Sequence, residues 1–356
     1  MAWGSEDGRI PEGQSVAAAR KSLRWTTWAA TCFLVANGLN LAMVGGARSQ
    51  DVNFALSPMR GAEQRIWRPY TDVTFHGGHD REMGEAALFL PLLQDQNQLL
   101  FADVRGRVFD DSSMEGNWGL AYRQLRPSGW IVGGYAFYDL RESVFDNTWH
   151  QGVLGAELMN INWDFRANGY LAEGGSQTAG APTAFLSGGT IVVANSLERA
   201  YSGFDGEVGR LLWSSAGRID AEVRGYVGGY HFDTDAAGFP EVSGPRARVE
   251  MRLYDLKLLG NDSRVTLGYQ YQYDDVRESQ SAGLITLRVP FGRGGGRSGR
   301  RLTPIGRRMV EPIVRDVDVV SLAPQGGRTV EQGQMNGVDI ASATQIDGGD
   351  LATEVA

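Results

Sequence analysis

The histidines of this sequence are the side chains best suited to metal binding, and there are only four of them. His76 and His79 flank two glycines and precede Asp80, a spacing that can place both imidazoles on one face of a turn as metal ligands. Two glycines between them are more typical of a solvated loop. We therefore expect neither a metal site nor a bound cofactor.

A second histidine lies near acidic residues at the predicted end of a strand. His231 and Asp233, together with Asp110 and Asp111, have the residue types of proteases that act at the rim of a membrane barrel. The flanking motifs do not match such proteases, and no serine stands in a nucleophile-elbow context. The expectation is that the chain is not an enzyme and has no catalytic residues.

A glycine-rich run over residues 292–301 resembles a phosphate-binding loop in composition, but it does not lie between a predicted strand and a predicted helix. No Lys-Ser/Thr pair follows the glycines, which argues against nucleotide binding. Glycine makes the run flexible, so it predicts a hinge at which the chain can reverse direction. Its arginines could pair with lumen carboxylates such as Asp103, Asp164 and Glu250, whereas a solvated, disordered basic linker is the alternative. These arginines are Arg293, Arg297, Arg300 and Arg301.

Arginine supplies almost all of the positive charge. The 34 basic residues include only two lysines, Lys21 and Lys257, which suits fixed, paired cations in a polar interior. The formal net charge of -8 gives no electrostatic attraction to nucleic acid, so no nucleic-acid partner is expected. The hydrophobic content of 42% is too high for a disordered chain.

The first 47 residues have the order of an export signal. Lys21 and Arg24 precede an apolar run over residues 25–44, and small residues follow at 45–47. A transmembrane helix is the alternative, but two asparagines interrupt the run, so we predict a signal peptide over residues 1–47. Residues 48–66 would then form a short periplasmic lead-in.

Polar and apolar residues alternate through the body of the chain. Between residues 99 and 109, one face carries Val104 and other apolar residues, and the opposite face carries Arg105 and other charged ones. The same alternation recurs over 161–171 and 246–253. The polar residues that we predict to face a common interior are Asp103, Arg105, Arg107, Asp164, Arg166, Arg246, Arg248, Glu250 and Arg252.

The alternating segments are long. Strands of soluble sandwiches average five to six residues, whereas a tilted strand needs about nine to eleven to cross a bilayer. The sequence therefore predicts an all-β fold, a twelve-stranded antiparallel transmembrane β-barrel over residues 67–292. The predicted strands lie near 68–76, 84–93, 99–109, 116–124, 130–139, 150–158, 161–172, 197–212, 218–230, 244–255, 263–274 and 281–291.

Loop lengths and aromatic residues give the barrel a predicted orientation. Connections after even-numbered strands are mostly shorter than those after odd-numbered strands, as in outer-membrane barrels whose two termini are periplasmic. Aromatic residues near strand ends predict girdles at the two interfaces. They are Trp67, Tyr70, Trp118, Trp130, Tyr138, Trp149, Trp163, Tyr201, Tyr226 and Tyr273.

Several segments follow one another in a recognisable order, among them Leu88-Phe-Leu-Pro-Leu-Leu93, Gly133-Gly-Tyr-Ala-Phe-Tyr-Asp139 and Arg308-Met-Val-Glu-Pro-Ile-Val-Arg315. These segments resemble the β-domain of inverse autotransporters, the intimin and invasin family. The resemblance covers about residues 67–318. It implies an outer-membrane anchor of type V secretion that helps to export a C-terminal passenger, and a chain that turns back through the pore after the last strand.

On this resemblance, residues 293–320 are a hinge and a linker that threads the lumen. Besides the four hinge arginines, the linker positions are Arg308, Pro312 and Arg315. The implied partners are outer-membrane lipid, periplasmic chaperones and the barrel assembly machinery, with a surface receptor of unidentified chemistry. The runner-up function is an open, porin-like channel whose arginine-lined lumen prefers anions.

The tail after the linker departs from the family pattern. Residues 321–356 are acidic and rich in Gly, Gln and Asp, and they are too few for a sandwich domain of about 100 residues. We expect this tail to be disordered and exposed on the cell surface. An adhesion role is in doubt, because no large passenger is present.

Overall fold

The computed structural model describes residues 66–78, 82–187, 190–217, 220–291, 301–315, 319–324, 328–332, 334–335 and 338–339. The predicted signal peptide, the lead-in before residue 66 and three of the four hinge arginines lie outside the described residues. Among the residues that are described, no helix is long and apolar enough to cross a bilayer.

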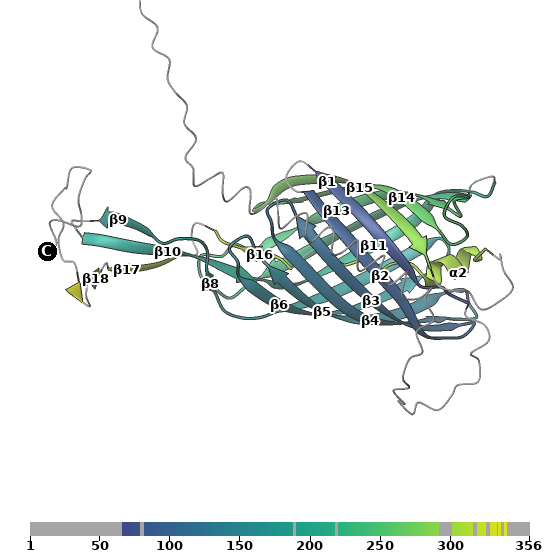
Figure 1. Cartoon of the computed structure of the whole chain (residues 1–356), viewed down its shortest axis with the longest axis horizontal. Helices are drawn as coiled ribbons and strands as arrows, with labels where there is room; N and C mark the ends of the chain where they lie inside the picture. Colours follow the sequence, from purple (N-terminus) through teal and green to yellow (C-terminus); the bar gives the residue numbers. More distant parts are fainter. Residues whose placement is uncertain are drawn as a thin grey trace, which may run out of the picture.

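Twelve antiparallel strands close into a barrel, in which each strand pairs with the barrel strand next in sequence and β1 closes against β15 (Figure 1). The predicted twelve-stranded barrel is therefore confirmed. The barrel strands are β1 (Tyr70–Gly78), β2 (Glu82–Gln94), β3 (Gln98–Phe109), β4 (Met114–Leu125), β5 (Ile131–Glu142), β6 (Thr148–Met159), β7 (Trp163–Ala172), β11 (Ser202–Ser215), β12 (Asp220–Asp233), β13 (Val242–Tyr254), β14 (Arg264–Asp274) and β15 (Glu278–Pro290).

Side chains alternate between the two faces of the wall. In β3, Asp103, Arg105 and Arg107 are buried while the residues between them are partly exposed toward the outside. Because successive side chains of a strand point to opposite faces, one segment supplies both an apolar outer surface and a polar interior. The most exposed apolar side chains of the outer surface include Phe75, Leu154, Leu171, Phe204 and Val227.

The predicted aromatic girdles are only partly present. Trp118, Tyr138 and Tyr273 are exposed on the outer surface, as expected. Others have the opposite parity along their strands or precede them, so they pack inside. The buried ones are Trp67, Tyr70, Trp149, Tyr201 and Tyr226.

One connection differs most from the sequence prediction. Residues 173–201 contain β8 (Gln177–Thr178), β9 (Thr183–Ser187) and β10 (Thr190–Ala200), which project beyond the rim of the barrel (Figure 1). The predicted strand over 197–212 is accordingly two strands: β10 ends at Ala200, and β11 begins at Ser202. The other connections at this rim are short, because the strands extend further than predicted.

The tail contains strands where the sequence predicted disorder. β16 (Ser321–Leu322) and β17 (Arg328–Gln332) both pair with β10, and β18 (Gln334–Met335) pairs with β19 (Val338–Asp339). Main-chain pairing explains this order, since a strand edge offers hydrogen bonds to a polar segment that has no core of its own.

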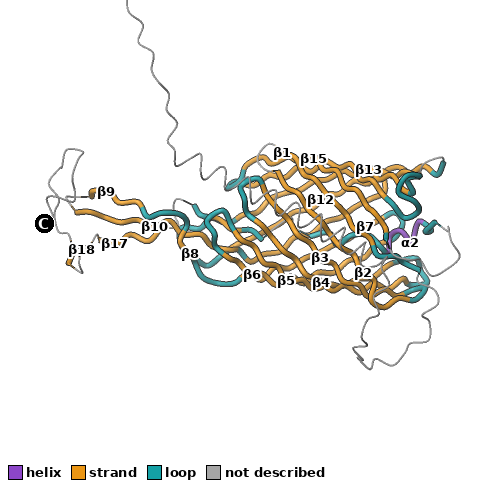
Figure 2. Tube along the Cα trace, in the orientation of Figure 1, coloured by secondary structure: helices purple, strands orange, loops and turns teal. Residues whose placement is uncertain are grey.

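A short helix, α2 (Pro304–Met309), lies at the end of the barrel opposite the projecting sheet (Figure 2). Thr303 begins it, because its hydroxyl accepts a hydrogen bond from the Gly306 amide at 3.2 Å and Pro304 suits the first turn. The chain after α2 contacts inward-facing side chains of many barrel strands, which makes the interior the candidate functional site.

Candidate functional site

The barrel wall balances most of its inward charges within itself. Arg105 donates two hydrogen bonds of 2.7 Å to Asp103, and Arg107 contacts Glu85 at 2.6 Å and Glu115 at 3.0 Å. Since an unpaired charge removed from water is strongly disfavoured, buried arginines of this kind need carboxylate partners. On the far wall, Arg246, Arg248 and Arg252 face Asp205, Glu207, Glu222 and Glu250.

Asp164 on β7 pairs both with wall arginines and with the linker. It is fully buried and accepts hydrogen bonds from Arg166 at 3.0 Å and Arg224 at 2.9 Å. It also pairs with Arg308 of α2. The first turn after the hinge is thereby held to β7 by a charged contact.

Glu311, just after α2, is the reverse arrangement: a linker carboxylate surrounded by arginines. Its two oxygens lie 3.0 Å from Arg252 and 2.9 Å from Arg264, and Arg308 lies at 3.3 Å. Glu311 is 1% exposed. Without this carboxylate, three buried guanidinium groups would have less negative charge near them. The linker therefore supplies a negative charge that balances arginines of the wall.

Arg315 forms the third charged contact. It donates two hydrogen bonds to the Asp139 carboxylate of β5, at 2.7 and 2.9 Å, and lies over the Phe137 ring at 4.6 Å from its centroid. The two parallel N–H donors match the geometry of a carboxylate, which makes such pairs strong and specific.

Wall arginines also bind the linker main chain. Arg123 donates to the carbonyls of Met309 and Glu311, at 2.8 and 2.6 Å, and Arg105 donates to the carbonyl of Ile313 at 2.7 Å. Arg288 and Tyr70 donate to the carbonyl of Val310, at 3.0 and 2.8 Å, as a further pair. An extended segment has no partners of its own for these carbonyls, so the wall supplies them.

At the mouth beside α2, Arg307 contacts Asp220 at 2.6 Å and Asp255 at 2.7 Å. Burial opposes the charged form of this guanidinium, but the hydrogen bond to Asp220 and the charge of Asp255 outweigh it and raise the pKa of Arg307. Arg301 is half-exposed and lies 3.7 Å from Asp255. The helix is therefore held at this rim by permanently charged groups.

Inward-facing glycines leave room for these contacts. A Cβ at Gly119 would lie 2.3 Å from the Phe137 ring, which packs across β4 toward Arg315. A Cβ at Gly155 would lie 2.0 Å from the Tyr135 ring. Both positions need a residue without a side chain, because aromatic groups of the neighbouring strand lie over them.

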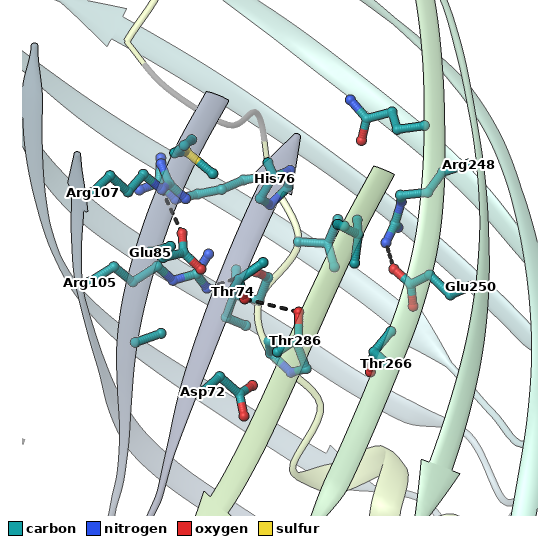
Figure 3. A pocket seen from close by; sticks show the side chains of 18 of the residues that line it. Asp72, Thr74, His76, Glu85, Arg105, Arg107, Arg248, Glu250, Thr266 and Thr286 are labelled. Atoms are coloured by element: carbon teal, nitrogen blue, oxygen red, sulfur yellow. Dashed lines mark hydrogen bonds and ion pairs between the residues drawn. The ribbon is translucent and has the colours of Figure 1, made fainter. Parts of the chain in front are cut away.

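A cavity of about 140 Å³ remains between the linker and one wall (Figure 3). Glu85 and Arg107 lie on one side of it and Arg248 and Glu250 on the other, and Thr74 and Thr286 form a 2.9 Å hydrogen bond between β1 and β15. Pro312 lines the cavity from the linker side. The charged residues around the cavity are paired.

Among the hinge arginines, which were expected to pair with carboxylates such as Asp103, Asp164 and Glu250, the structure describes Arg301, which lies 3.7 Å from Asp255. Asp103 and Glu250 pair with wall arginines, and Asp164 pairs with wall arginines and with Arg308. Arg293, Arg297 and Arg300 lie outside the described residues. Six contact residues were not singled out from the sequence, although five of them follow the same alternation: Arg123, Asp139, Arg141, Arg264, Arg288 and Glu311.

The histidines show no arrangement for metal or acid–base chemistry in the part of the chain that is described. His231 lies 3.1 Å from Glu241 rather than near a catalytic aspartate, and both are well exposed. Asp111 accepts hydrogen bonds from Ser113 within its own turn. No cluster of three potential metal ligands occurs among the described residues.

Residues 49–216 match the family model of the inverse autotransporter β-domain. The match extends through β11 and thus includes eight of the twelve barrel strands. Over these residues, the barrel is an inverse autotransporter β-domain. It is an outer-membrane translocator barrel of type V secretion.

One solved structure of low identity shows the same fold, and a second is less similar. A chain from a study of in-meso crystallization of membrane proteins has a TM-score of 0.51 and 18% identity, over 72% of this chain and 99% of that chain. The β-domain of the Bordetella autotransporter BrkA has a TM-score of 0.35 and 11% identity, over 63% of this chain and 99% of that chain. No curated protein matches the sequence. The inverse autotransporter assignment therefore rests on the family match and the barrel.

Proposed function

We propose that this inverse autotransporter exports its own C-terminal segment through the barrel and displays it, and that residues 301–320 then fill the lumen. The observation that carries the proposal is the charge matching of Arg308, Glu311 and Arg315 with buried wall residues. These three positions are spread over eight residues of the linker. Such matching along a segment is expected of a permanent occupant.

The same contacts argue against an open, arginine-lined channel. A porin keeps its lumen charges in water, whereas Asp139, Asp164 and Arg264 are nearly fully buried beneath the linker. Removing the linker would take away the Arg315 partner of Asp139 and the Glu311 partner of Arg264. The linker is therefore part of the proposed resting state.

The proposed route begins with the predicted signal at residues 1–47, which would direct the chain to the periplasm for assembly by chaperones and the barrel assembly machinery. The chain leaves β15 at the rim that carries α2, and residues 293–320 lead to the opposite rim. An extended chain crosses a 30 Å bilayer core in about nine or ten residues, so these 28 residues are enough for a hinge, a helix and a crossing.

Cysteine labelling of intact cells tests the route. Single cysteines at Ser321 and Ser342 should react with a membrane-impermeant maleimide, because both would lie beyond the outer rim. A matched cysteine at Ser298 should react only after the outer membrane is permeabilised. If Ser342→Cys behaves like Ser298→Cys, the tail does not cross and the proposed export is wrong.

A further inference from the structure

We infer that β10 and Glu198 form a strand-acceptor site at the outer rim, which captures the segment of this chain that leaves the lumen. The inference rests on the proposed export of the tail and adds the device that would hold the exported segment. The occupant is the tail of the same chain, through residues 319–322 and 328–332.

β10 is the central strand of the sheet that projects from the barrel. One edge of β10 pairs with β8 and β9, and the other edge pairs with β16 and β17 of the tail. β10 leads directly into β11, so the acceptor strand is anchored in the barrel wall. Figure 1 shows β9, β10 and β17 extending together away from the rim.

The end of β10 next to the barrel, which we call the foot of the site, contacts the emerging chain through the buried carboxylate of Glu198. Glu198 is 3% exposed, and its Oε1 accepts a hydrogen bond of 2.8 Å from the Ser321 hydroxyl. Its Oε2 accepts hydrogen bonds of 2.7 Å from Ser143 and from Asn147, in the loop between β5 and β6. One carboxylate thus joins the acceptor strand, a neighbouring loop and the tail.

Apolar and main-chain contacts complete the foot of the site. Val319 is fully buried against Trp149 and Ala200, and its amide donates to Glu115 at 2.9 Å while its carbonyl accepts from Arg141 at 3.1 Å. The Tyr201 amide donates to the carbonyl of Val320 at 2.9 Å. The chain is therefore in a defined register as it leaves the lumen.

Beyond the foot, the contact with β10 is main-chain pairing. Residues 328–332 pair with Ser196 to Val192, and Leu322 pairs with Arg199. Strand addition draws its affinity from the main chain and tolerates varied sequences. The site therefore combines side-chain recognition near the barrel with main-chain pairing further out.

Pairing with β10 should oppose movement of the tail back into the lumen more than movement outward. A segment paired along β10 must break those hydrogen bonds before it can slide back into the lumen, and the pairing also covers an otherwise exposed strand edge. Forward movement breaks no such pairs until the segment has folded onto β10. The acceptor is thus expected to oppose return of the tail to the periplasm.

Cross-linking in the full-length protein tests the register. Directly opposite positions of an antiparallel pair hold their Cβ atoms about 4.5 to 5.5 Å apart, close to what a disulfide needs. On intact cells under mild oxidation, Ala194→Cys with Val330→Cys should form an intramolecular disulfide at least tenfold faster than Asn195→Cys with Val330→Cys. The second pair is offset by one residue, so its cysteines belong to opposite faces.

Labelling of Ser342→Cys distinguishes failure of the acceptor site from failure of the proposed export. If Ser342→Cys is labelled from outside but the registered and offset pairs cross-link equally, the acceptor site is wrong and export stands. If Ser342→Cys is not labelled and no cross-link forms, both proposals are wrong.

A proline variant provides a second readout in the same cells. Alternate residues of an antiparallel strand donate toward a given neighbour, so replacing both Thr329 and Val330 by proline removes an amide that faces β10. Tail cleavage by an added protease should become at least fivefold faster, while the heat-modifiability of the barrel stays unchanged. Unchanged cleavage would overturn the inference.

Discussion

We expect Glu311→Gln to increase ion conductance through a barrel that is otherwise closed by its linker. The substitution removes a buried negative charge that faces Arg252 at 3.0 Å, Arg264 at 2.9 Å and Arg308 at 3.3 Å. Removing one partner of a buried ion pair costs about 3 to 5 kcal/mol, which corresponds to a shift of about two to four orders of magnitude in the equilibrium between the bound and the displaced linker. In planar bilayers, the wild-type protein should be largely closed and the variant should open frequently.

Glu173→Gln is the matched control, because Glu173 is well exposed and lies 3.8 Å from His150 rather than among buried arginines. It should conduct like the wild type. Steady, large wild-type conductance that deletion of residues 293–356 leaves unchanged would favour the open-channel function instead. Equal conductance of the two glutamine variants would show that Glu311 does not hold the linker.

Val104→Arg should prevent assembly of the barrel in the membrane. Val104 is midway along β3, and the polar neighbours Asp103 and Arg105 face the interior, so Val104 faces lipid. An arginine on the lipid face near the midplane costs about 2 to 4 kcal/mol. We expect loss of the heat-modifiable folded form in the outer-membrane fraction.

Gln270→Arg introduces the same side chain on the inward face, beside the cavity, and should leave the heat-modifiable form intact. Arg105→Ala should also preserve assembly, although it removes one donor to the linker carbonyl of Ile313. If Val104→Arg and Gln270→Arg assembled equally well, the assignment of the two faces would be inverted.

The barrel follows from local information. Residues i and i+2 of a strand share a face whatever the strand pairs with, so Asp103, Arg105 and Arg107 could be assigned to one face from the sequence alone. The length of each alternating segment then distinguishes a membrane strand from a sandwich strand. Neither inference needs knowledge of the neighbouring strand.

The small errors in the predicted barrel have a common cause. The strand predicted over 197–212 joined β10 to β11, because both are alternating segments and only Tyr201 separates them. Period-two alternation identifies extended chain but does not say which partner it pairs with. β10 pairs with the neighbouring β8 and β9 and with strands of the tail, which lie more than a hundred residues later in the chain.

The sequence by itself determined that arginines and carboxylates share the inward face, because that requires only alternation and composition. Which charges meet was decided by tertiary structure: Asp164 pairs with Arg308, 144 residues away, and Arg315 with Asp139, 176 residues away. Strand tilt, register and the path of the linker bring these groups together, and none of the three is encoded in a local pattern. Glu311 illustrates the difference, since a lone acid between basic residues looks unremarkable until the fold surrounds it with Arg252, Arg264 and Arg308.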